Sequence, residues 1–156
     1  MSTELGIFAR YFTQIDRAIA VGLASGRVVS VDFQPTVPSD ADDDHALLDR
    51  IDTYLNGDSD HLADVDIALT VPTDQRRVLE ATRNVPYGEE VSLDRILRMA
   101  GLDEDKTDDQ STAQRALAEN PIPLIVPDHR VRDAPSGAPS DVITQLQDIE
   151  QIETVS

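Results

Sequence analysis

Two apolar runs with strand periodicity stand near the beginning of the chain. They are AIAVGLA at residues 18–24 and RVVSVDF at residues 27–33, with Ser25-Gly26 between them. In the second run Val29, Val31 and Phe33 fall on one face, because successive side chains of a strand point to opposite faces. Two such runs joined by a Ser-Gly pair predict a β-hairpin.

A helical pattern follows the hairpin. From residue 44 to 55 the apolar positions recur at i, i+1, i+4, i+7 and i+8, which makes one wide stripe on a helix; they are Leu47, Leu48, Ile51, Tyr54 and Leu55. Asn56-Gly57 ends the helix. Residues 65–69 alternate again and predict another strand. Residues 1–72 are therefore expected to form a small α/β domain.

Residues 73–152 are expected to form a second, mostly helical domain. Thr73 is a candidate N-cap for a helix that runs to about residue 84, and Ser92 for a second helix that ends at Gly101. After an acidic linker at 103–109, Ser111 or Thr112 would cap a third helix.

That third helix would be broken before Pro121, and the last helix would begin near Ser140. The second and third helices make a helix-turn-helix candidate, although their linker is longer than usual. The predicted fold class is α/β: an N-terminal hairpin-and-helix unit followed by a helical, winged-helix-like C-terminal domain.

The charge balance is strongly acidic, with 30 Asp and Glu against 13 Lys and Arg and a net charge of -17. Such a surface suits either an acidic interaction module or a halophilic protein, since at molar salt the Debye length falls to about 3 Å and self-repulsion is screened. The acids are spread along the chain, which favours the second. Residues 36–66 hold ten acids and one base, whereas residues 76–132 hold eleven acids and nine bases.

The chain contains no cysteine. Disulfides, zinc–thiolate sites and thiol nucleophiles are thereby excluded. His45 and His61 lie in separate acidic stretches, so no metal site and no cofactor is expected. Residues 1–9 lack a basic segment followed by a long apolar run, and no stretch has the length of a membrane span. A cytoplasmic protein without membrane association is predicted.

A series of motifs in the second half resembles the C-terminal domain of the O6-alkylguanine-DNA alkyltransferases. In order they are Pro86-Tyr87-Gly88-Glu89, Ser92, the helix around 113–118, Asn120-Pro121, and Pro127-Asp128-His129-Arg130-Val131 after an apolar run. The block from Asn120 to Val131 is the most specific part, and the match to the family's N-terminal domain is weak. The resemblance implies the fold of that family and an interaction with double-stranded DNA in DNA repair.

The departures from the family pattern bear directly on function. Asp128 stands at the position of the cysteine that accepts the alkyl group, here called the acceptor position. Leu93 replaces the family's tyrosine, and Ser111 replaces the arginine that fills the gap left by a flipped base. A carboxylate is a much poorer nucleophile toward an alkyl carbon than a thiolate. Alkyltransferase-like proteins also lack the cysteine and bind alkylated bases, but they keep that tyrosine and arginine.

Asp128 and His129 admit several interpretations. They could belong to a remodelled pocket with Leu93 and Pro127, where Asp128 accepts hydrogen bonds from the donor edge of a base. They could form a catalytic Asp–His dyad. Alternatively, Asp128 caps a turn and His129 is held by a partner in the core.

Two further polar residues have roles implied by the resemblance. Asn120 would organise the site by bonding nearby backbone, or it is simply a turn former before proline. Glu150 would resemble the family's proton-relay glutamate, but with no thiol to deprotonate we interpret it as an acid on the surface of the last helix.

Six residues are candidates for contact with DNA, or for ion pairs with the many carboxylates: Ser111, Thr112, Gln114, Arg115, Arg130 and Arg132. The leading hypothesis is a non-catalytic DNA-binding protein that recognises damaged, alkylated DNA and passes it to a repair partner. An acidic protein-interaction or regulatory domain that has lost DNA binding is the alternative. An enzyme with altered chemistry at Asp128 and His129 is the third.

Overall fold

The computed structural model describes residues 5–57, 62 and 64–151. The chain divides into two compact units, Met1–Ala68 and Leu69–Ser156. Across the described ranges, no helix combines the length and the apolar content that a membrane crossing requires.

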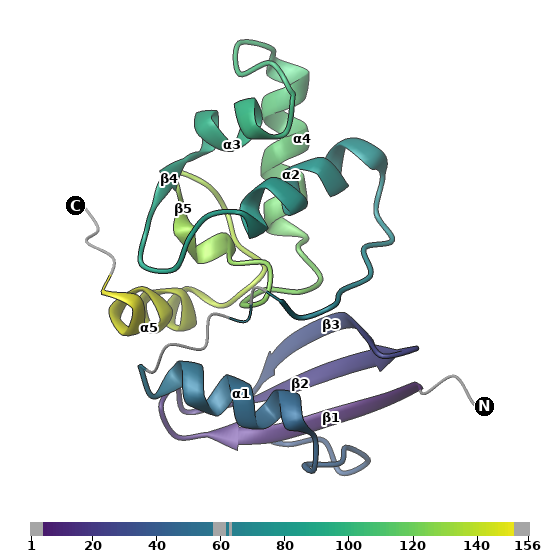
Figure 1. Ribbon diagram of the computed structural model, residues 1–156. Coiled ribbons are helices and arrows are strands. Elements are labelled where there is room, and N and C mark those ends of the chain that lie inside the picture. Colours follow the sequence, from purple (N-terminus) through teal and green to yellow (C-terminus); the bar gives the residue numbers. More distant parts are fainter. Residues whose placement is uncertain (1–4, 58–61, 63, 152–156) are drawn as a thin grey trace. The chain divides into compact units, whose positions relative to one another are not determined.

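The N-terminal unit is built on an antiparallel sheet in the order β1-β2-β3 (Figure 1). Its strands are β1 Leu5–Phe12, β2 Arg17–Ala24 and β3 Arg27–Gln34. The predicted hairpin is confirmed as β2 and β3, and both turn residues have positive φ, 53° at Ser25 and 78° at Gly26, as a type I′ hairpin turn requires. The sequence pattern missed β1, because its exposed and buried residues do not follow a simple alternation: Ile7 and Tyr11 are exposed but Ala9 is buried.

Helix α1, Ala46–Leu55, packs against β1 through the predicted stripe, all five members of which are buried. His45 caps it, since its Nδ1 accepts a hydrogen bond from the Leu47 amide at 3.0 Å. The strand predicted at 65–69 is wrong. In its place, Ile67 forms one isolated bridge with Val28 at the edge of β3. Two backbone bonds hold that short contact, which is too brief to continue as a strand.

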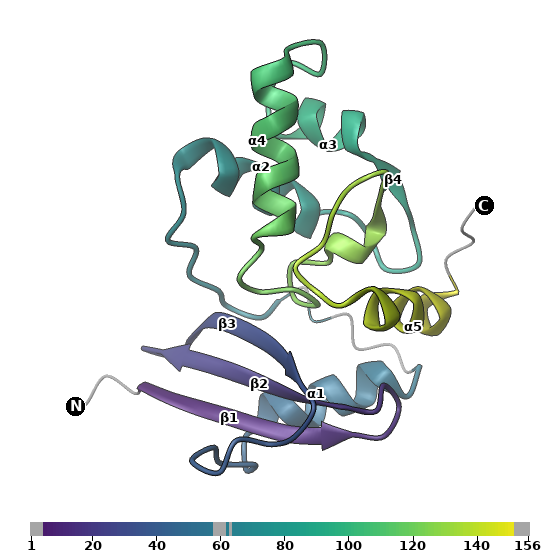
Figure 2. The ribbon, with the colours of Figure 1, turned by 180° about the vertical axis from the view of Figure 1, so that it is seen from behind.

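The described part of the C-terminal unit, residues 69–151, contains four α-helices and a minimal sheet. Helix α2, Thr73–Arg83, crosses and packs on α4, Thr107–Ala118 (Figures 1 and 2). Between them in sequence lie β4, Val91–Ser92, and α3, Leu93–Met99. The 3-10 helix η1, Asp128–Arg130, leads into β5, Val131–Arg132, which pairs in parallel with β4. Helix α5, Ser140–Glu150, packs against η1.

The predicted helix starts have mixed outcomes. Ser92 is confirmed as an N-cap, with its Oγ accepting from the Arg95 amide at 3.2 Å. Thr73 is the first helical residue, so its predicted role as N-cap is wrong; Pro72 precedes it.

Helix α4 begins several residues earlier than predicted. The prediction that Ser111 or Thr112 caps it is wrong, because both lie inside the helix. Asp108 and Asp109 occupy its first turn, where carboxylates interact favourably with the helix dipole. Asp109 also accepts a hydrogen bond from the Asp103 amide at 2.8 Å. Residues 107–109 of the predicted acidic linker are therefore helix, and a short turn joins α3 to α4.

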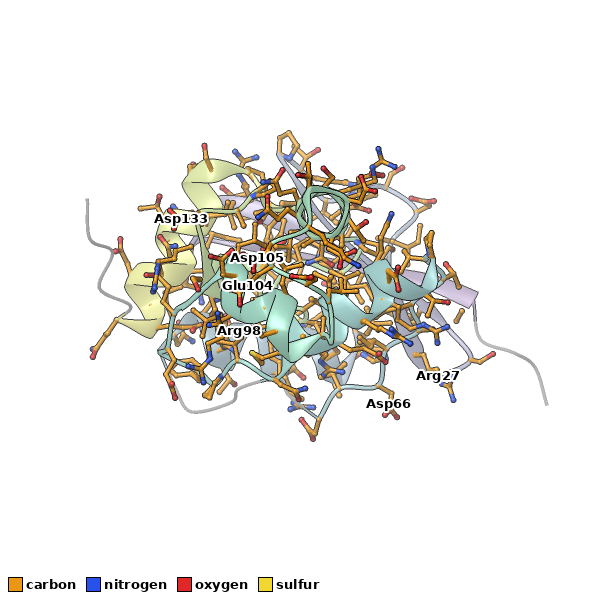
Figure 3. All side chains as sticks on the ribbon, turned by 90° about the horizontal axis from the view of Figure 1, so that it is seen from above. Arg27, Asp66, Arg98, Glu104, Asp105 and Asp133 are labelled. Carbon is orange, nitrogen blue, oxygen red and sulfur yellow. The ribbon has the colours of Figure 1, made fainter. Side chains whose placement is uncertain are left out.

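That turn carries an exposed ion pair. Arg98 of α3 reaches Glu104 at 2.6 Å, and Asp105 lies next to the pair (Figure 3). The mixed helix-and-strand architecture confirms the predicted fold class, with the third strand added to the N-terminal unit.

Candidate functional site

The Asp128 carboxylate accepts hydrogen bonds from three groups of its own chain. The residue is the first of η1 and is 2% exposed. Oδ1 accepts from the Ser136 hydroxyl at 2.6 Å, and Oδ2 accepts from the Gly137 amide at 2.8 Å and from Asn120 Nδ2 at 3.0 Å. Three donors of the same chain therefore occupy three of the carboxylate's roughly four acceptor positions.

Asn120 connects Asp128 to the turn that precedes it. Its Nδ2 also donates to the Val126 carbonyl at 3.1 Å, and its Oδ1 accepts from the Ile122 amide at 3.0 Å. Within this turn Leu124 has a φ of 79°, a left-handed conformation that costs a bulky residue about 1–3 kcal/mol. Asn120 is thus more than a turn former, because its side chain braces a strained segment against Asp128.

Burial and hydrogen bonding act in opposite directions on Asp128. Burial raises the pKa of its carboxyl above the ordinary value, and it outweighs the bonds from Ser136, Gly137 and Asn120 and the charge of His129, which lower the pKa. The three donors therefore favour the ionised form of the carboxyl, whereas burial favours the protonated form.

The loop at residues 133–139 lies against this centre. Ser136 accepts from the Ala138 amide at 3.0 Å while it donates to Asp128. Gly137 approaches Asn120 so closely that an added Cβ would lie 2.5 Å from the Asn120 carbonyl oxygen. Sequence reasoning did not find Ser136 and Gly137 as partners of Asp128. The Ser-Gly pair in a loop was the available signal, but such pairs are common in turns.

A second hydrogen-bond network begins at the next residue, His129, and is centred on Glu150. Glu150 of α5 is 4% exposed, so its interpretation as a surface acid is wrong. Its Oε2 lies 2.6 Å from His129 Nε2, and its two oxygens accept from Arg130 Nε at 2.8 Å and Nη2 at 3.0 Å. The Gly88 amide also donates to Oε1, at 3.1 Å.

Arg130 belongs to this buried network. Its Nη1 donates to the Val85 carbonyl at 2.8 Å, and its guanidinium lies 5.6 Å from the centre of the Tyr87 ring. Since the residue is 5% exposed, the predicted phosphate contact through Arg130 does not hold in this structure.

The charges explain why the second network remains ionic. Burial by itself would raise the pKa of Glu150, but the hydrogen bonds and charges of His129 and Arg130 outweigh it, so the pKa lies well below its ordinary value. His129 is held by a core partner, as one of the interpretations expected. The hydrogen bonds of Asp128 run to the 133–139 loop and Asn120, whereas that of His129 runs to Glu150. This arrangement does not support a catalytic dyad.

A cleft of about 380 Å³ adjoins the two networks. This volume falls within the range of about 300–1,000 Å³ that is typical of small-ligand pockets. Its lining includes Glu90, Asp128, His129, Val131, Arg132, Asp133, Ala134, Ser136, Ile143 and Gln147. Leu93 and Pro127, which we predicted in a pocket with Asp128, are buried and are not part of this lining. Within the described residues, no group of three or more potential metal ligands occurs.

Helix α4 presents one exposed stripe at helical spacing. It consists of Thr107, Asp108, Ser111, Gln114, Arg115 and Ala118. Of the predicted DNA contacts, Ser111, Gln114 and Arg115 thus lie together on an accessible face. Thr112 is half-buried and its hydroxyl donates to the Asp108 carbonyl at 2.9 Å. Arg132 is exposed on β5, with its Nη1 4.0 Å from a Glu90 oxygen.

Comparison with known protein families gives a match in the second half of the chain. The profile described as "6-O-methylguanine DNA methyltransferase, DNA binding domain" matches residues 73–155. Among individual proteins, the methylated-DNA–protein-cysteine methyltransferase of Methanothermobacter thermautotrophicus is 33% identical over 91 residues, which cover 54% of this chain and 46% of that protein. The match thus spans about half the length of the relative.

Solved structures show the same fold over nearly the whole chain. The O6-methylguanine methyltransferase of Mycobacterium tuberculosis aligns with a TM-score of 0.73 and 20% identity, covering 98% of this chain and 97% of that one. A second structure, of Mycobacterium tuberculosis OGT in complex with DNA, has a TM-score of 0.73 at 20% identity and covers 94% and 92% of the two chains. The enzyme from Pyrococcus kodakaraensis is more distant, with a TM-score of 0.53 at 19% identity and coverage of 96% and 100%.

Proposed function

This chain belongs to the 6-O-methylguanine DNA methyltransferase family, and within that family we propose that it is a non-catalytic protein that binds double-stranded DNA and recognises damaged, alkylated sites for other repair proteins. The observation that carries this proposal is the state of Asp128. A side chain that is 2% exposed and hydrogen-bonded to three donors of its own chain is poorly placed to accept a carbon.

The exposed stripe of α4 supports the DNA-binding part of the proposal. Gln114 and Arg115 project from the second helix of the helix-turn-helix pair, the arrangement in which a helix reads DNA. Acidic side chains lie at the two ends of α4, Asp108 and Asp109 in the first turn and Glu119 at the C-cap, and the exposed positions between them carry no carboxylate. A related structure of the same fold was solved in complex with DNA.

The acidic composition sets the conditions for a test. A net charge of -17 repels DNA at low salt, and an adaptation to molar salt, which the composition favours, would screen that repulsion. Phosphate contacts weaken as salt rises, so binding under these conditions depends on contacts other than charge.

Fluorescence anisotropy with a labelled duplex tests the proposal, at salt concentrations from low to molar KCl. We expect binding of a plain duplex and tighter binding of one that contains O6-methylguanine. Arg115→Ala should weaken binding of both duplexes. It should also reduce the slope of the logarithm of the binding constant against the logarithm of the salt concentration by about one, the contribution of one phosphate contact. Arg27→Ala is the matched control, because Arg27 is an exposed arginine in the β2–β3 turn region of the N-terminal unit (Figure 3).

Two outcomes would contradict the proposal. Absence of binding to either duplex at any salt concentration favours the alternative, an acidic protein-interaction domain. Transfer of a labelled methyl group from the duplex to the protein, detected in the intact-protein mass, would show that Asp128 or another residue does accept alkyl groups.

A further inference from the structure

We propose that the cleft beside Asp128 binds a positively charged alkylated base whose pairing edge is blocked by the alkyl group, such as N3-methylcytosine, and that Glu90 accepts a hydrogen bond from its amino group. The inference rests on the proposed DNA binding and deepens it, because it names the chemical class of the damaged base. A neutral lesion such as O6-methylguanine would be the weaker ligand of this cleft.

The cleft has the size and the walls to hold one base. Its volume of about 380 Å³ lies in the range of small-ligand pockets. Its lining is drawn from the residue before β4, from η1 and β5, from the 133–139 loop and from α5. Proteins that bind a single base outside the helix pack its ring against apolar side chains and contact its Watson–Crick edge through hydrogen bonds. Val131, Ala134 and Ile143 supply the apolar part of this wall.

The charged part of the lining is mostly acidic. Of the described residues that line the cleft, carboxylates are carried by Glu90, Asp128 and Asp133. A guanidinium comes from Arg132, whose side chain is 53% exposed. His129 also lines the cleft, but its ring belongs to the second network. Carboxylates in a partly enclosed site favour a ligand with a positive charge, since charges interact more strongly there than in bulk water.

The neutral polar side chains of the lining use donors within the chain. The Ser136 hydroxyl donates to Asp128 at 2.6 Å, and Gln147 Nε2 donates to the His129 carbonyl at 3.1 Å. The amide of Gln147 also carries an oxygen that can only accept. A ligand that brings N–H donors is therefore favoured over one that brings acceptors.

Glu90 is the carboxylate best placed to accept from such a ligand. Three of the roughly four acceptor positions of Asp128 are occupied by groups of its own chain. The Glu90 side chain is 14% exposed, and its Oε1 lies 4.0 Å from Arg132 Nη1, which is longer than a hydrogen bond. A pair of that length with a half-exposed arginine contributes little. Glu90 is thus a largely buried carboxylate that a cationic donor would stabilise.

Alkylation at N3 of cytosine gives the chemistry that this lining favours. The methylated ring is cationic at neutral pH, and its N4 amino group remains a donor of the kind that Glu and Asp accept in base recognition. Hydrogen bonds to ionised groups are stronger than those between neutral groups. O6-methylguanine, in contrast, is neutral and has lost its N1 proton, so it places an acceptor where the cleft also offers acceptors.

A blocked pairing edge also removes the need for a side chain that opens the duplex. N3-methylcytosine cannot pair normally, so taking it out of the stack costs less than for an intact pair. Ser111, on the exposed face of α4, is too short to fill the gap left by an extruded base. The chain is therefore suited to a base that is already unpaired.

The experiment uses the full-length protein and three labelled duplexes, in which the test base is N3-methylcytosine, its neutral isomer 5-methylcytosine, or O6-methylguanine. Each test base stands opposite an abasic site, so that differences in pairing do not contribute. By fluorescence anisotropy we expect N3-methylcytosine to bind about tenfold more tightly than 5-methylcytosine, and more tightly than O6-methylguanine. The preference should persist at molar KCl, because a largely buried carboxylate is screened less than an exposed one.

The position of the base is tested by NMR of methyl groups in the same complexes. With N3-methylcytosine bound, the methyl signals of Val131 and Ile143 should shift, because a ring packed against them changes the local magnetic field. Those of Leu48, in the core of the N-terminal unit, should stay in place.

Glu90→Gln keeps the shape of the side chain and removes its charge, so it should abolish most of the preference for N3-methylcytosine over 5-methylcytosine. Glu89→Gln is the matched control, because Glu89 is an exposed neighbour outside the lining and its loss changes the net charge equally. Should Glu90→Gln fail to fold, Asp133→Asn removes another carboxylate of the cleft, and asparagine tolerates the φ of 64° at this position. It should reduce the same preference.

Several results would overturn the inference and leave DNA binding intact. They are equal affinity for the two methylcytosines, tightest binding of O6-methylguanine, unshifted Val131 and Ile143 signals in the complex, or an equal effect of Glu89→Gln and Glu90→Gln. If no duplex binds, paired or with an abasic site, the proposed function fails and this inference fails with it.

Discussion

Glu150→Gln removes one negative charge from a buried hydrogen-bond network of the C-terminal unit. Glu150 accepts from Arg130 through two bonds and from the Gly88 amide, and it lies 2.6 Å from His129 Nε2. A glutamine of the same shape turns one acceptor oxygen into a donor that faces other donors. It also leaves the Arg130 guanidinium buried without its counter-charge.

The magnitude follows from the burial of the pair. Glu150 and Arg130 are 4% and 5% exposed, and removal of one partner from a buried pair costs about 3–5 kcal/mol. For a chain of 156 residues, each kcal/mol lowers Tm by about 2–4 °C. Even the lower bound of about 3 kcal/mol therefore lowers Tm by at least about 6 °C. A loss of that size approaches the whole stability of a typical domain, about 5–15 kcal/mol.

The assay is urea unfolding followed by circular dichroism, at low and at molar KCl. The loss should persist at high salt, because salt screens buried charges much less than exposed ones. Glu104→Gln is the matched control, since Glu104 pairs with Arg98 on the exposed α3–α4 turn and its loss should leave the midpoint unchanged. Equal urea midpoints for Glu150→Gln and Glu104→Gln would refute the reasoning, because the buried ion pair would then contribute no more to stability than the exposed one.

The remaining predictions concern the same two networks. Gly137→Ala should destabilise the C-terminal unit by about 1–3 kcal/mol, measured as a lower urea midpoint, because its Cβ would lie 2.5 Å from the Asn120 oxygen; an unchanged midpoint would show that the loop yields easily. Asp128→Cys alone should not accept a methyl group from O6-methylguanine DNA, because Ser111 is too short to hold an opened base pair apart, and a methylated protein in the mass spectrum would contradict this. Acidification should destabilise the protein through Glu150: its folded pKa is lowered, so its stabilisation is complete above its ordinary value of 4.5 and is lost as the pH falls below it. The fall in urea midpoint below that pH should be smaller in Glu150→Gln than in the parent protein, and an equal fall would assign the acid sensitivity to other groups.

Comparison of particular elements shows where the sequence was informative. The stripe of α1 and the β2–β3 hairpin depend on residues that are neighbours along the chain, so their periodicity was sufficient to predict them. The start of α4 was placed too late, because Ser111 and Thr112 are good caps in isolation but the acids at 108 and 109 suit the first turn as well. At the site, the sequence identified Asp128, His129 and Asn120 as polar residues of one region, and it misjudged Glu150 and Arg130.

By itself, the sequence determined the features that depend on composition and short-range order: the lack of any thiol, the excess of carboxylates, the main helices and one hairpin. Tertiary structure alone decided which polar groups are buried together. Glu150 is 21 residues from His129, and Gly137 is 9 residues from Asp128, and no local periodicity records that these groups meet. They meet because η1, the 133–139 loop and α5 fold onto one another, and burial then requires each charge and donor to find a partner there.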